Sequence, residues 1–303
     1  MAKVLHIFDL MPFVHAGHVN KYSMLEDYVD LGSSCKVLRT PTGGTSVIFN
    51  KLYEICGKGD IVFCSDRNPT IKKGILPEYK GNREHKHDIE VEKGAAEYIL
   101  QKCGFTVLAS AGYEADDYIY SVVKKFHDDY DEIIIYTGDS DLYFLVDDKV
   151  RIEPSSSRAK RVTKATYEDT KVHGDYYRYN SITMCKITGG DYTDCIPPLS
   201  QELIDKLSVM FSDSMLPVLG DKNTVRYFVS IFAPEAVKQV DLVFPLDVDE
   251  LPDRFTEPCK EYICNWGDVI NNKNFRNLAD PEFDPSPYIK EMQSHGLYLM
   301  EGD

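Results

Sequence analysis

Long apolar runs are missing from this 303-residue sequence. None approaches the roughly 20 consecutive residues that a helix needs to span a bilayer, so we expect no membrane partner. Near the N-terminus, Asp9 interrupts the first apolar stretch too early for a secretory signal. With 43% hydrophobic and 27% charged residues, the composition is typical of a soluble globular protein, and a cytoplasmic location is expected.

Cysteine motifs are absent as well. The eight cysteines form no C-x-x-C pair, and the closest two, Cys259 and Cys264, have no nearby histidine. This spacing argues against a zinc site or a disulfide framework and favours reduced thiols in the core. The sequence also has no P-loop and no G-x-G-x-x-G, which disfavours a nucleotide-hydrolysing motor or a dinucleotide enzyme. No Ser/His/Asp nucleophile set stands out.

Basic residues are too few to balance the acidic ones, and the formal net charge is −15. Residues 201–303 carry 9 Lys and Arg against 19 Asp and Glu, whereas residues 1–200 carry 25 against 30. A negative protein repels polyanions, so this charge at first argues against nucleic acid as a partner. Divalent cations would reverse the balance in the first two-thirds, because they bridge acids to phosphates.

Short apolar, β-branched runs alternate with helical patterns along the first half of the chain. Strands are predicted at 3–8, 60–64, 105–108 and 133–136, and helices at 45–56, at 88–103 and from 114 onward. This alternation predicts an α/β fold with a mostly parallel central sheet flanked by helices. The segment 67–83 reads as an exposed basic loop, and residues 199–303 read as a mainly helical C-terminal region.

Carboxylates follow several of the predicted strands. Asp9, Asp66 and Asp139 each come just after the carboxyl end of a strand, and Asp141 follows closely. Another acidic group, residues 114–117, opens a helix. Each group alone is typical of a helix cap or a turn. Together they are expected to converge, because ligands of open α/β sheets bind at the carboxyl ends of the strands.

Carboxylates that share one patch cannot all ionise without a cation, because like charges repel. Their hard oxygen ligands suit Mg²⁺ or Mn²⁺. Two such ions about 4 Å apart can clamp the attacking and the leaving oxygen of a phosphodiester. A nearby Lys or Arg can neutralise the charge that develops on the phosphoryl oxygens. The acid pattern therefore predicts metal-assisted hydrolysis of a phosphodiester.

Seven motifs occur in a fixed order along residues 3–198. They are Asp9, P-T-G-G-T at 41–45, Asp66, L-P-E-Y-K-G-N-R at 76–83, Y-E-A-D-D at 113–117, T-G-D-S-D-L at 137–142 and G-D-Y-T-D-C-I-P at 190–197. With these motifs the chain resembles the 5′-nuclease superfamily of flap endonucleases and 5′→3′ exonucleases. This superfamily includes the 5′-nuclease domain of bacterial DNA polymerase I and phage RNase H-like enzymes. The resemblance implies a PIN-like fold, with a catalytic domain at 1–198 and a helical arch at about 77–104.

The resemblance also implies a site with two Mg²⁺ or Mn²⁺ ions. Four acids would surround the first ion: Asp9, Asp66, Glu114 and Asp116. Five would surround or support the second: Asp117, Asp139, Asp141, Asp191 and Asp194. Lys80 would match the family's catalytic lysine at the base of the arch, and Arg83 its arginine. Tyr79 is expected to stack on the terminal base, although it could also only pack.

Further basic residues are predicted to contact nucleic acid. Lys186 would match a phosphate-contacting lysine of the family, and Lys86 of the arch would face the single strand with His85 and His87. The other candidates lie in the 67–83 segment and in a basic stretch at 151–186; they are Lys72, Lys73, Arg158, Lys160 and Arg161. The alternative for these residues is a solvated surface without a ligand.

The sequence departs from the family after residue 196. Members of the family continue with a glycine-rich helix–hairpin–helix turn whose backbone N–H groups hold duplex phosphates. Here residues 197–203 contain no glycine and include an acid, so this clamp is expected to be absent or rebuilt. The preference for a flap over a plain end is therefore left open.

The function predicted from these features is a Mg²⁺-dependent 5′-nuclease that acts in replication or repair. Its partners would be DNA or RNA/DNA with a 5′ end or flap, with replication proteins as further candidates. A monomer is expected, in the host cytoplasm if the protein is phage-encoded. Two alternatives are a catalytically silent relative that binds nucleic acid or replication proteins, and a PIN-type ribonuclease.

Overall fold

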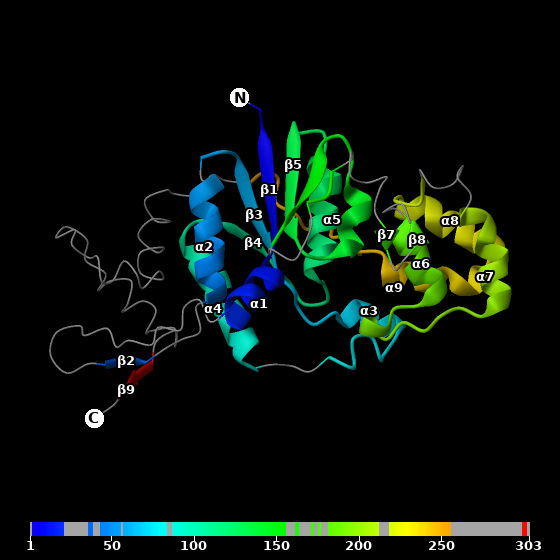
Figure 1. Ribbon diagram of the computed structural model, residues 1–303, viewed down its shortest axis with the longest axis horizontal. Coiled ribbons are helices and arrows are strands. Elements are labelled where there is room, and N and C mark those ends of the chain that lie inside the picture. Colours follow the sequence, from blue (N-terminus) through cyan, green and yellow to red (C-terminus); the bar gives the residue numbers. More distant parts are fainter. Residues whose placement is uncertain are drawn as a thin grey trace. The chain divides into compact units, whose positions relative to one another are not determined.

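A five-stranded, all-parallel sheet organises the computed structural model (Figure 1). Its order is β4-β3-β1-β5-β6, and the strands are β1 Val4–Asp9, β3 Asp60–Cys64, β4 Thr106–Leu108, β5 Glu132–Thr137 and β6 Val150–Pro154. The structure describes residues 2–20, 36–38, 43–55, 57–83, 87–155, 161–163, 171–172, 175–176, 181–211, 218–255 and 299–301. The predicted α/β class with a parallel sheet is confirmed.

The strand pairing explains why these segments read as apolar runs. In the parallel pair of β1 and β5, Leu5 lies opposite Ile133 and Ile7 opposite Ile135. β6 continues the sheet, with Ile152 opposite Ile135. All five side chains are buried. A strand covered on both faces needs apolar residues at every position, which removes the alternation seen in half-exposed strands.

The chain divides into two compact units. The first contains Met1–Asp9, Cys64–Glu84 and Leu108–Asp253, and the second Leu10–Phe63, His85–Val107 and Arg254–Asp303. Helices of the first unit are α3 Thr70–Ile75, α5 Ala115–Phe126, α6 Ser181–Gly189, α7 Gln201–Leu207, α8 Lys222–Phe232 and α9 Val237–Val243. Its 3₁₀ turns are η1 Ser140–Leu145, η2 Tyr192–Asp194, η3 Ser208–Phe211 and η5 Pro234–Ala236. Two short strands, β7 Lys171–Val172 and β8 Asp175–Tyr176, pair antiparallel.

Three helices of the second unit pack against one another: α1 Leu10–Asn20, α2 Gly43–Ile55 and α4 His87–Lys102. Gly44 permits the close approach of α2 to α1, because a Cβ there would lie 2.5 Å from the Cα of Val14. The buried Glu92 of α4 accepts a hydrogen bond from the Gly44 N–H. Residues 87–102 of the predicted arch therefore form a helix with one face packed on α1 and α2. In the same unit, β2 Lys36–Leu38 pairs antiparallel with β9 Leu299–Glu301.

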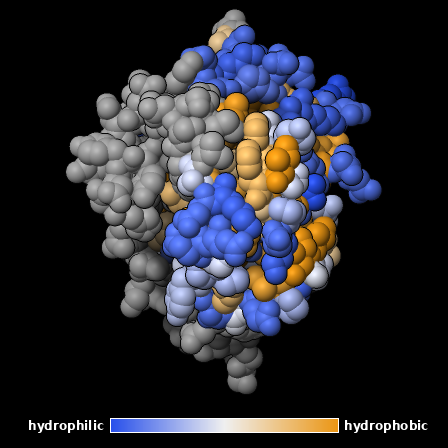
Figure 2. Space-filling model, turned by 90° about the vertical axis from the view of Figure 1, so that its right-hand side faces the viewer, coloured by the Kyte–Doolittle hydropathy of each residue, from blue (hydrophilic) through white to orange (hydrophobic). Residues whose placement is uncertain are grey.

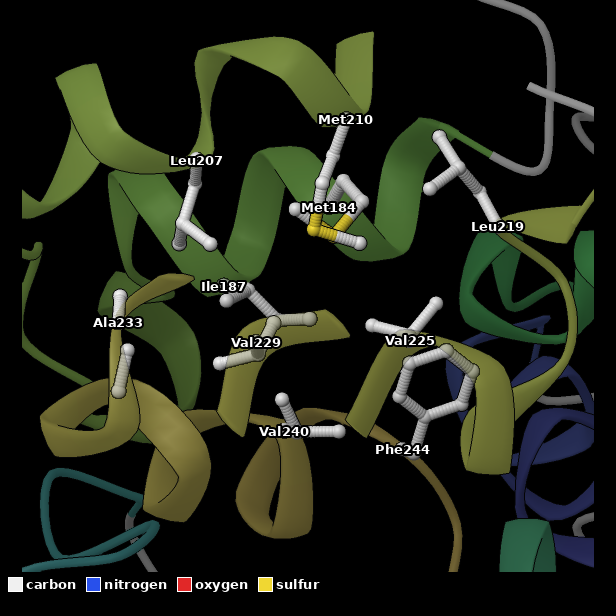
Figure 3. Close-up of a cluster of buried hydrophobic side chains, with 11 residues drawn as sticks. Met184, Ile187, Leu207, Met210, Leu219, Val225, Val229, Ala233, Val240 and Phe244 are labelled. Carbon is white, nitrogen blue, oxygen red and sulfur yellow. The ribbon is translucent and has the colours of Figure 1, made fainter. Parts of the chain in front are cut away.

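A separate hydrophobic core joins α6 to the helices that follow it (Figure 3). Met184 and Ile187 of α6 point toward Val229 of α8 and Val240 of α9, and Phe244 closes one end. The division predicted at residue 198 remains a prediction. This core, however, contains side chains from both sides of that position.

Some apolar side chains remain on the surface of α8. Tyr227, Ile231 and Phe232 are exposed, and Figure 2, which faces the α7 and α8 end of the molecule, shows hydrophobic residues among hydrophilic ones.

Among the described residues, no helix is both long enough and apolar enough to cross a membrane.

Two isoleucines provide a matched test of the α6–α9 core. Ile187 is fully buried in it, whereas Ile231 is 53% exposed. We expect Ile187→Ala to lower the free energy of unfolding by about 2–5 kcal/mol, because the removed methyl groups leave a cavity. Ile231→Ala should change it by less than about 0.5 kcal/mol. Urea unfolding of both variants measures the difference, and equal values would contradict the packing described here.

Candidate active site

The ends of β1 and β5 are joined by one threonine. The Thr137 hydroxyl donates a hydrogen bond of 2.8 Å to Oδ2 of Asp9. The Thr137 hydroxyl oxygen in turn accepts the Asp139 N–H at 3.0 Å. Both Asp9 and Thr137 are buried. Two acids that are 130 residues apart in the sequence are thereby fixed at one edge of the sheet.

Asp139 and Asp141 are held by the turn that follows β5. Asp139 caps η1, and its Oδ1 accepts the Asp141 N–H at 2.9 Å. Oδ2 of Asp141 pairs with Lys186 Nζ at 2.5 Å, whereas Oδ1 is buried and has no hydrogen-bond partner among the described residues. Burial and the neighbouring Asp139 raise the pKa of Asp141 to about 6.

The N-terminus of α5 contributes the next acids. Asp66, just past β3, accepts the Ala115 N–H at 2.8 Å. Glu114 is the N-cap of α5 and forms a capping box with Asp117, whose Oδ2 accepts the Glu114 N–H. These carboxylates accept hydrogen bonds from N–H groups that have no partner within the helix. The positive end of the helix dipole also stabilises their negative charge.

Asp116 lies among three other carboxylates. Burial raises the pKa of Asp116 well above its usual range, and repulsion from Asp139, Asp9 and Asp66 raises it further. The buried Cys64 thiol has a raised pKa for the same reasons, burial first and then Asp9, Asp116 and Asp66. Asp9, Asp66, Asp116 and Asp139 therefore form one group, here called the acid cluster. The predicted convergence of the strand ends is found.

Lys72 corrects the prediction of an exposed basic loop. Residues 70–75 form helix α3, and Lys72 is only 4% exposed. Its Nζ lies 3.0 Å from Glu114 and 3.8 Å from Asp117. Burial lowers the pKa of Lys72, but the two acids outweigh this effect and raise it. A lysine so enclosed serves first to neutralise acids of the protein.

Tyr79 is a second correction, because it is 1% exposed and offers no free face to a base. Its hydroxyl lies 2.9 Å from Oε2 of Glu114 and 3.1 Å from Oδ2 of Asp194. Lys72 and Lys80 lie over its ring, with Nζ 5.5 and 5.4 Å from the centroid. Tyr79 is thus a packed hydrogen-bond donor between two acids.

Lys80 and Arg83 remain at the site, each paired with an acid. Lys80 Nζ donates to Glu114, and Arg83 lies 2.6 Å from Asp194. Burial raises the pKa of Glu114, but Lys72 and Lys80 outweigh it and lower the pKa to about 2. The Lys80 backbone has φ 54°, a left-handed conformation that costs roughly 1–2 kcal/mol, and its N–H donates to the Asp194 carbonyl.

Lys186 of α6 bridges two of the predicted ligands. Besides Asp141, it pairs with Asp191 at 2.6 Å. Burial raises the pKa of Asp191, but the hydrogen bonds from Lys186 and Thr193 outweigh it, so the pKa is lowered. Gly190 precedes this turn with φ 75°, and a Cβ there would lie 2.5 Å from the Ile196 carbonyl oxygen. Only glycine fits at this position.

Asp117 was predicted beside the second ion, but both of its oxygens are taken by backbone N–H groups. Oδ2 accepts from Glu114, and Oδ1 accepts the Leu246 N–H at 2.6 Å. Residues 245–253, here called the strap, run along α5. Ser121 accepts the Val248 N–H at 2.8 Å, and Lys124 pairs with Asp247 at 2.8 Å. Asp117 thus ties the helical C-terminal part to the start of α5.

A cavity of about 120 Å³ opens between these side chains. Four basic residues line it, namely Lys72, Lys80, Arg83 and Lys186, together with acids that include Asp116 and Asp139. It has room for several water molecules. Within the described part of the chain, no three His, Cys or carboxylate side chains are already arranged as the ligands of one ion.

The other predicted contacts lie away from these pairs or outside the described residues. Lys73 is half-buried and donates to Asn68 at 2.9 Å, and Arg161 is exposed and pairs with Glu153. Lys86, Arg158 and Lys160 lie outside the described residues, as do His85 and the side chain of His87. Sequence reasoning gave Thr137 and the strap no role at the site, because they act through an uncharged hydroxyl and through the backbone N–H of Leu246.

Comparison with known proteins agrees with these motifs. Residues 32–176 match the family described as "5′-3′ exonuclease, N-terminal resolvase-like domain". The matched region includes Asp66, the acids at the start of α5, and Asp139 with Asp141. Over these residues the chain is similar to the 5′-nuclease superfamily. The resemblance inferred from the ordered motifs is confirmed.

Individual relatives of this superfamily match part of the chain. The chain is 35% identical over 147 residues to the 5′-3′ exonuclease of Bacillus subtilis, covering 44% of this chain and 47% of that protein. It is 31% identical over 133 residues to DNA polymerase I of Caldicellulosiruptor bescii, covering 43% and 16%. The chain thus spans less than half the length of these curated relatives. Among solved structures, the T5 5′-exonuclease with bound zinc gives a TM-score of 0.49 at 16% identity, covering 88% of this chain and 98% of that one.

Adjacent lysines test the role of Lys72. We expect Lys72→Met to lower the free energy of unfolding by about 3–5 kcal/mol, because it strands the buried carboxylates of Glu114 and Asp117. Lys73→Met, one residue away and half-buried, should change it by less than about 0.5 kcal/mol. Urea unfolding of both variants in EDTA measures the two effects. Similar values would show that Lys72 is not the counter-charge proposed here.

The raised pKa of Asp141 predicts a pH dependence of stability. The folded-state pKa of about 6 exceeds the usual aspartate value of about 3.9, so protonation stabilises the fold. That stabilisation is complete below pH 3.9 and is lost as the pH rises through 6. In EDTA, Asp141→Asn should therefore gain stability relative to wild type between pH 4 and 7, by at most about 3 kcal/mol. Asp205→Asn, on the exposed face of α7, is the control, and an equal slope for both variants would exclude this role.

Proposed function

We propose that this protein is a divalent-metal-dependent 5′-nuclease that acts in replication or repair. It would hydrolyse phosphodiester bonds near the 5′ ends of DNA, or of RNA paired to DNA. The observation that carries the proposal is that Asp116 and Asp139 of the acid cluster line one cavity together with Lys80, Arg83 and Lys186. The similarity of residues 32–176 to the 5′-3′ exonuclease family supports the reaction class.

The donor set fits hard divalent cations. All members of the acid cluster offer carboxylate oxygens, which suit Mg²⁺ or Mn²⁺. The mutual repulsion that raises the pKa of Asp116 is the kind a cation relieves, and the buried Oδ1 of Asp141 is open to such a partner. Asp9, Asp66, Asp116, Asp139 and Asp141 would hold the ions. When bound, the ions would lower the pKa of a water molecule and stabilise charge on the phosphodiester.

The chain's own cations would orient the substrate. Lys80, Arg83 and Lys186 line the cavity and can donate hydrogen bonds to phosphoryl oxygens, where negative charge grows during hydrolysis. Tyr79 and Lys72 hold Glu114 in place below them. The left-handed backbone of Lys80, anchored on Asp194, directs its amine to this position.

One observation favours a second candidate, a silent relative that binds nucleic acid without cutting it. Glu114, Asp141 and Asp191 are already neutralised by lysines. A site balanced in this way does not depend on metal ions for its charge. Such a protein would bind oligonucleotides equally well in EDTA and in Mg²⁺ and would show no turnover.

Cleavage of 5′-labelled flap, nicked and blunt substrates tests the proposal. With Mg²⁺ or Mn²⁺ we expect products whose lengths separate exonuclease from endonuclease action, and no cleavage in EDTA. Asp139→Asn and Asp141→Asn should each reduce the rate by roughly 10²-fold or more, because they remove cation ligands. Asp205→Asn should leave it unchanged.

Two results would redirect this assignment. Turnover that survives the loss of both Asp139 and Asp141 would reject the site. Cutting of circular single-stranded RNA, which has no 5′ end, would instead favour a PIN-type ribonuclease.

A further inference from the structure

Tyr192 is the most exposed large hydrophobic residue in the described part of the chain, at 88%. The next, Tyr227 on α8, is 62% exposed. A single exposed tyrosine does not by itself indicate a binding site. The position of Tyr192 is what distinguishes it, because its neighbours Thr193 and Asp194 line the candidate active-site cavity.

The backbone beneath Tyr192 is fixed from several directions. Asp191 and Ile196 exchange two backbone hydrogen bonds of 2.9 Å across the turn, and Cys195 closes it with φ 58°. The Tyr192 carbonyl accepts the side-chain amide of Asn82 at 3.0 Å. The ring is therefore in solvent while its backbone is held, so no further ordering of the backbone is needed when the ring binds a flat partner.

Two basic residues contact the turn that carries this ring, both through Asp194. Arg83 follows Asn82, is half-exposed on its side chain and pairs with Asp194, two residues after Tyr192. Lys80 donates its N–H to the Asp194 carbonyl. An aromatic face next to a phosphate-binding pair is the combination that proteins use for single-stranded nucleic acid.

We propose that Tyr192 stacks on the base of an unpaired nucleotide next to the phosphate held in the cavity. This inference rests on the proposed function and names its substrate class. A base inside a duplex is excluded because both of its faces are already covered, and the single-stranded probe used below tests stacking on an unpaired base. Tyr79, which the sequence suggested for this role, is buried and hydrogen-bonded to acids.

Substituted proteins and abasic substrates test the stack together. Tyr192→Ala should weaken binding of a single-stranded oligonucleotide, measured by fluorescence anisotropy, by roughly 5- to 150-fold. Tyr192→Phe and Tyr192→Trp keep a ring and should recover most of this loss. Tyr227→Ala, at an exposed tyrosine on α8, should not alter binding. Far-ultraviolet circular dichroism checks that each variant is folded.

The same oligonucleotide with one abasic residue, moved position by position, locates the stacked base. Wild type should lose affinity at one position by the factor seen for Tyr192→Ala, and the variant should lose nothing more there. At that position, 2-aminopurine fluorescence should be quenched by wild type and not by Tyr192→Ala. Equal sensitivity of both proteins at every position, or a loss for Tyr192→Phe as large as for Tyr192→Ala, would overturn the proposal.

These binding measurements need no turnover. If wild type cleaves nothing but shows the abasic effect, the proposed hydrolysis fails and the stack stands. If wild type cleaves and Tyr192→Ala binds and cleaves as well as wild type, the stack fails and the hydrolysis stands.

Discussion

Repulsion among carboxylates is the constraint on which the site depends. Two unit charges 4 Å apart interact by about 4 kcal/mol at the effective dielectric of a protein surface. Four acids gathered at strand ends would therefore push the sheet edge and α5 apart. The structure offsets part of this repulsion with the positive end of α5, where Asp116 lies, and with Lys80, whose charge lowers the pKa of Asp116.

The helical part that follows the sheet domain shares in this balance. Lys186 and Asp191 lie on or just after α6, and the core of Figure 3 fixes α6 against α8 and α9. The strap then returns to α5 and donates the Leu246 N–H to Asp117. Through the capping box, the same carboxylate holds the Glu114 backbone. The C-terminal helices thus help to position α5, which carries Asp116, in addition to packing against one another.

Much of this arrangement could be predicted because it depends on short, strong patterns. Buried parallel strands are apolar throughout, so the run at 133–136 located β5, and the acid after each strand located the site. Lys72 was misjudged because α3 has only six residues, too few for a periodic pattern to show which side faces inward. Tyr79 was misjudged because it lies in the turn after α3, where no periodicity indicates burial. Asp117 was misjudged because a capping acid and a metal-binding acid look the same in sequence.

The extent to which each lysine is buried distinguishes Lys72, which neutralises acids of the protein, from Lys80 and Lys186, which can bind a phosphate. Lys72 is enclosed by Glu114, Asp117 and the Tyr79 ring, so exchanging those partners for a phosphate would expose buried charge. The side chains of Lys80 and Lys186 are 18% and 25% exposed, against 5% for Lys72, and line the cavity, so each can exchange a carboxylate for a phosphoryl oxygen at a lower cost in solvation. In the proposed nuclease, the acids they release are those that cations would then neutralise. In the isolated chain, Lys80 and Lys186 are paired with carboxylates of the protein. Substrate and metal would break these pairs together, because the phosphate binds the lysines while the cations bind the carboxylates.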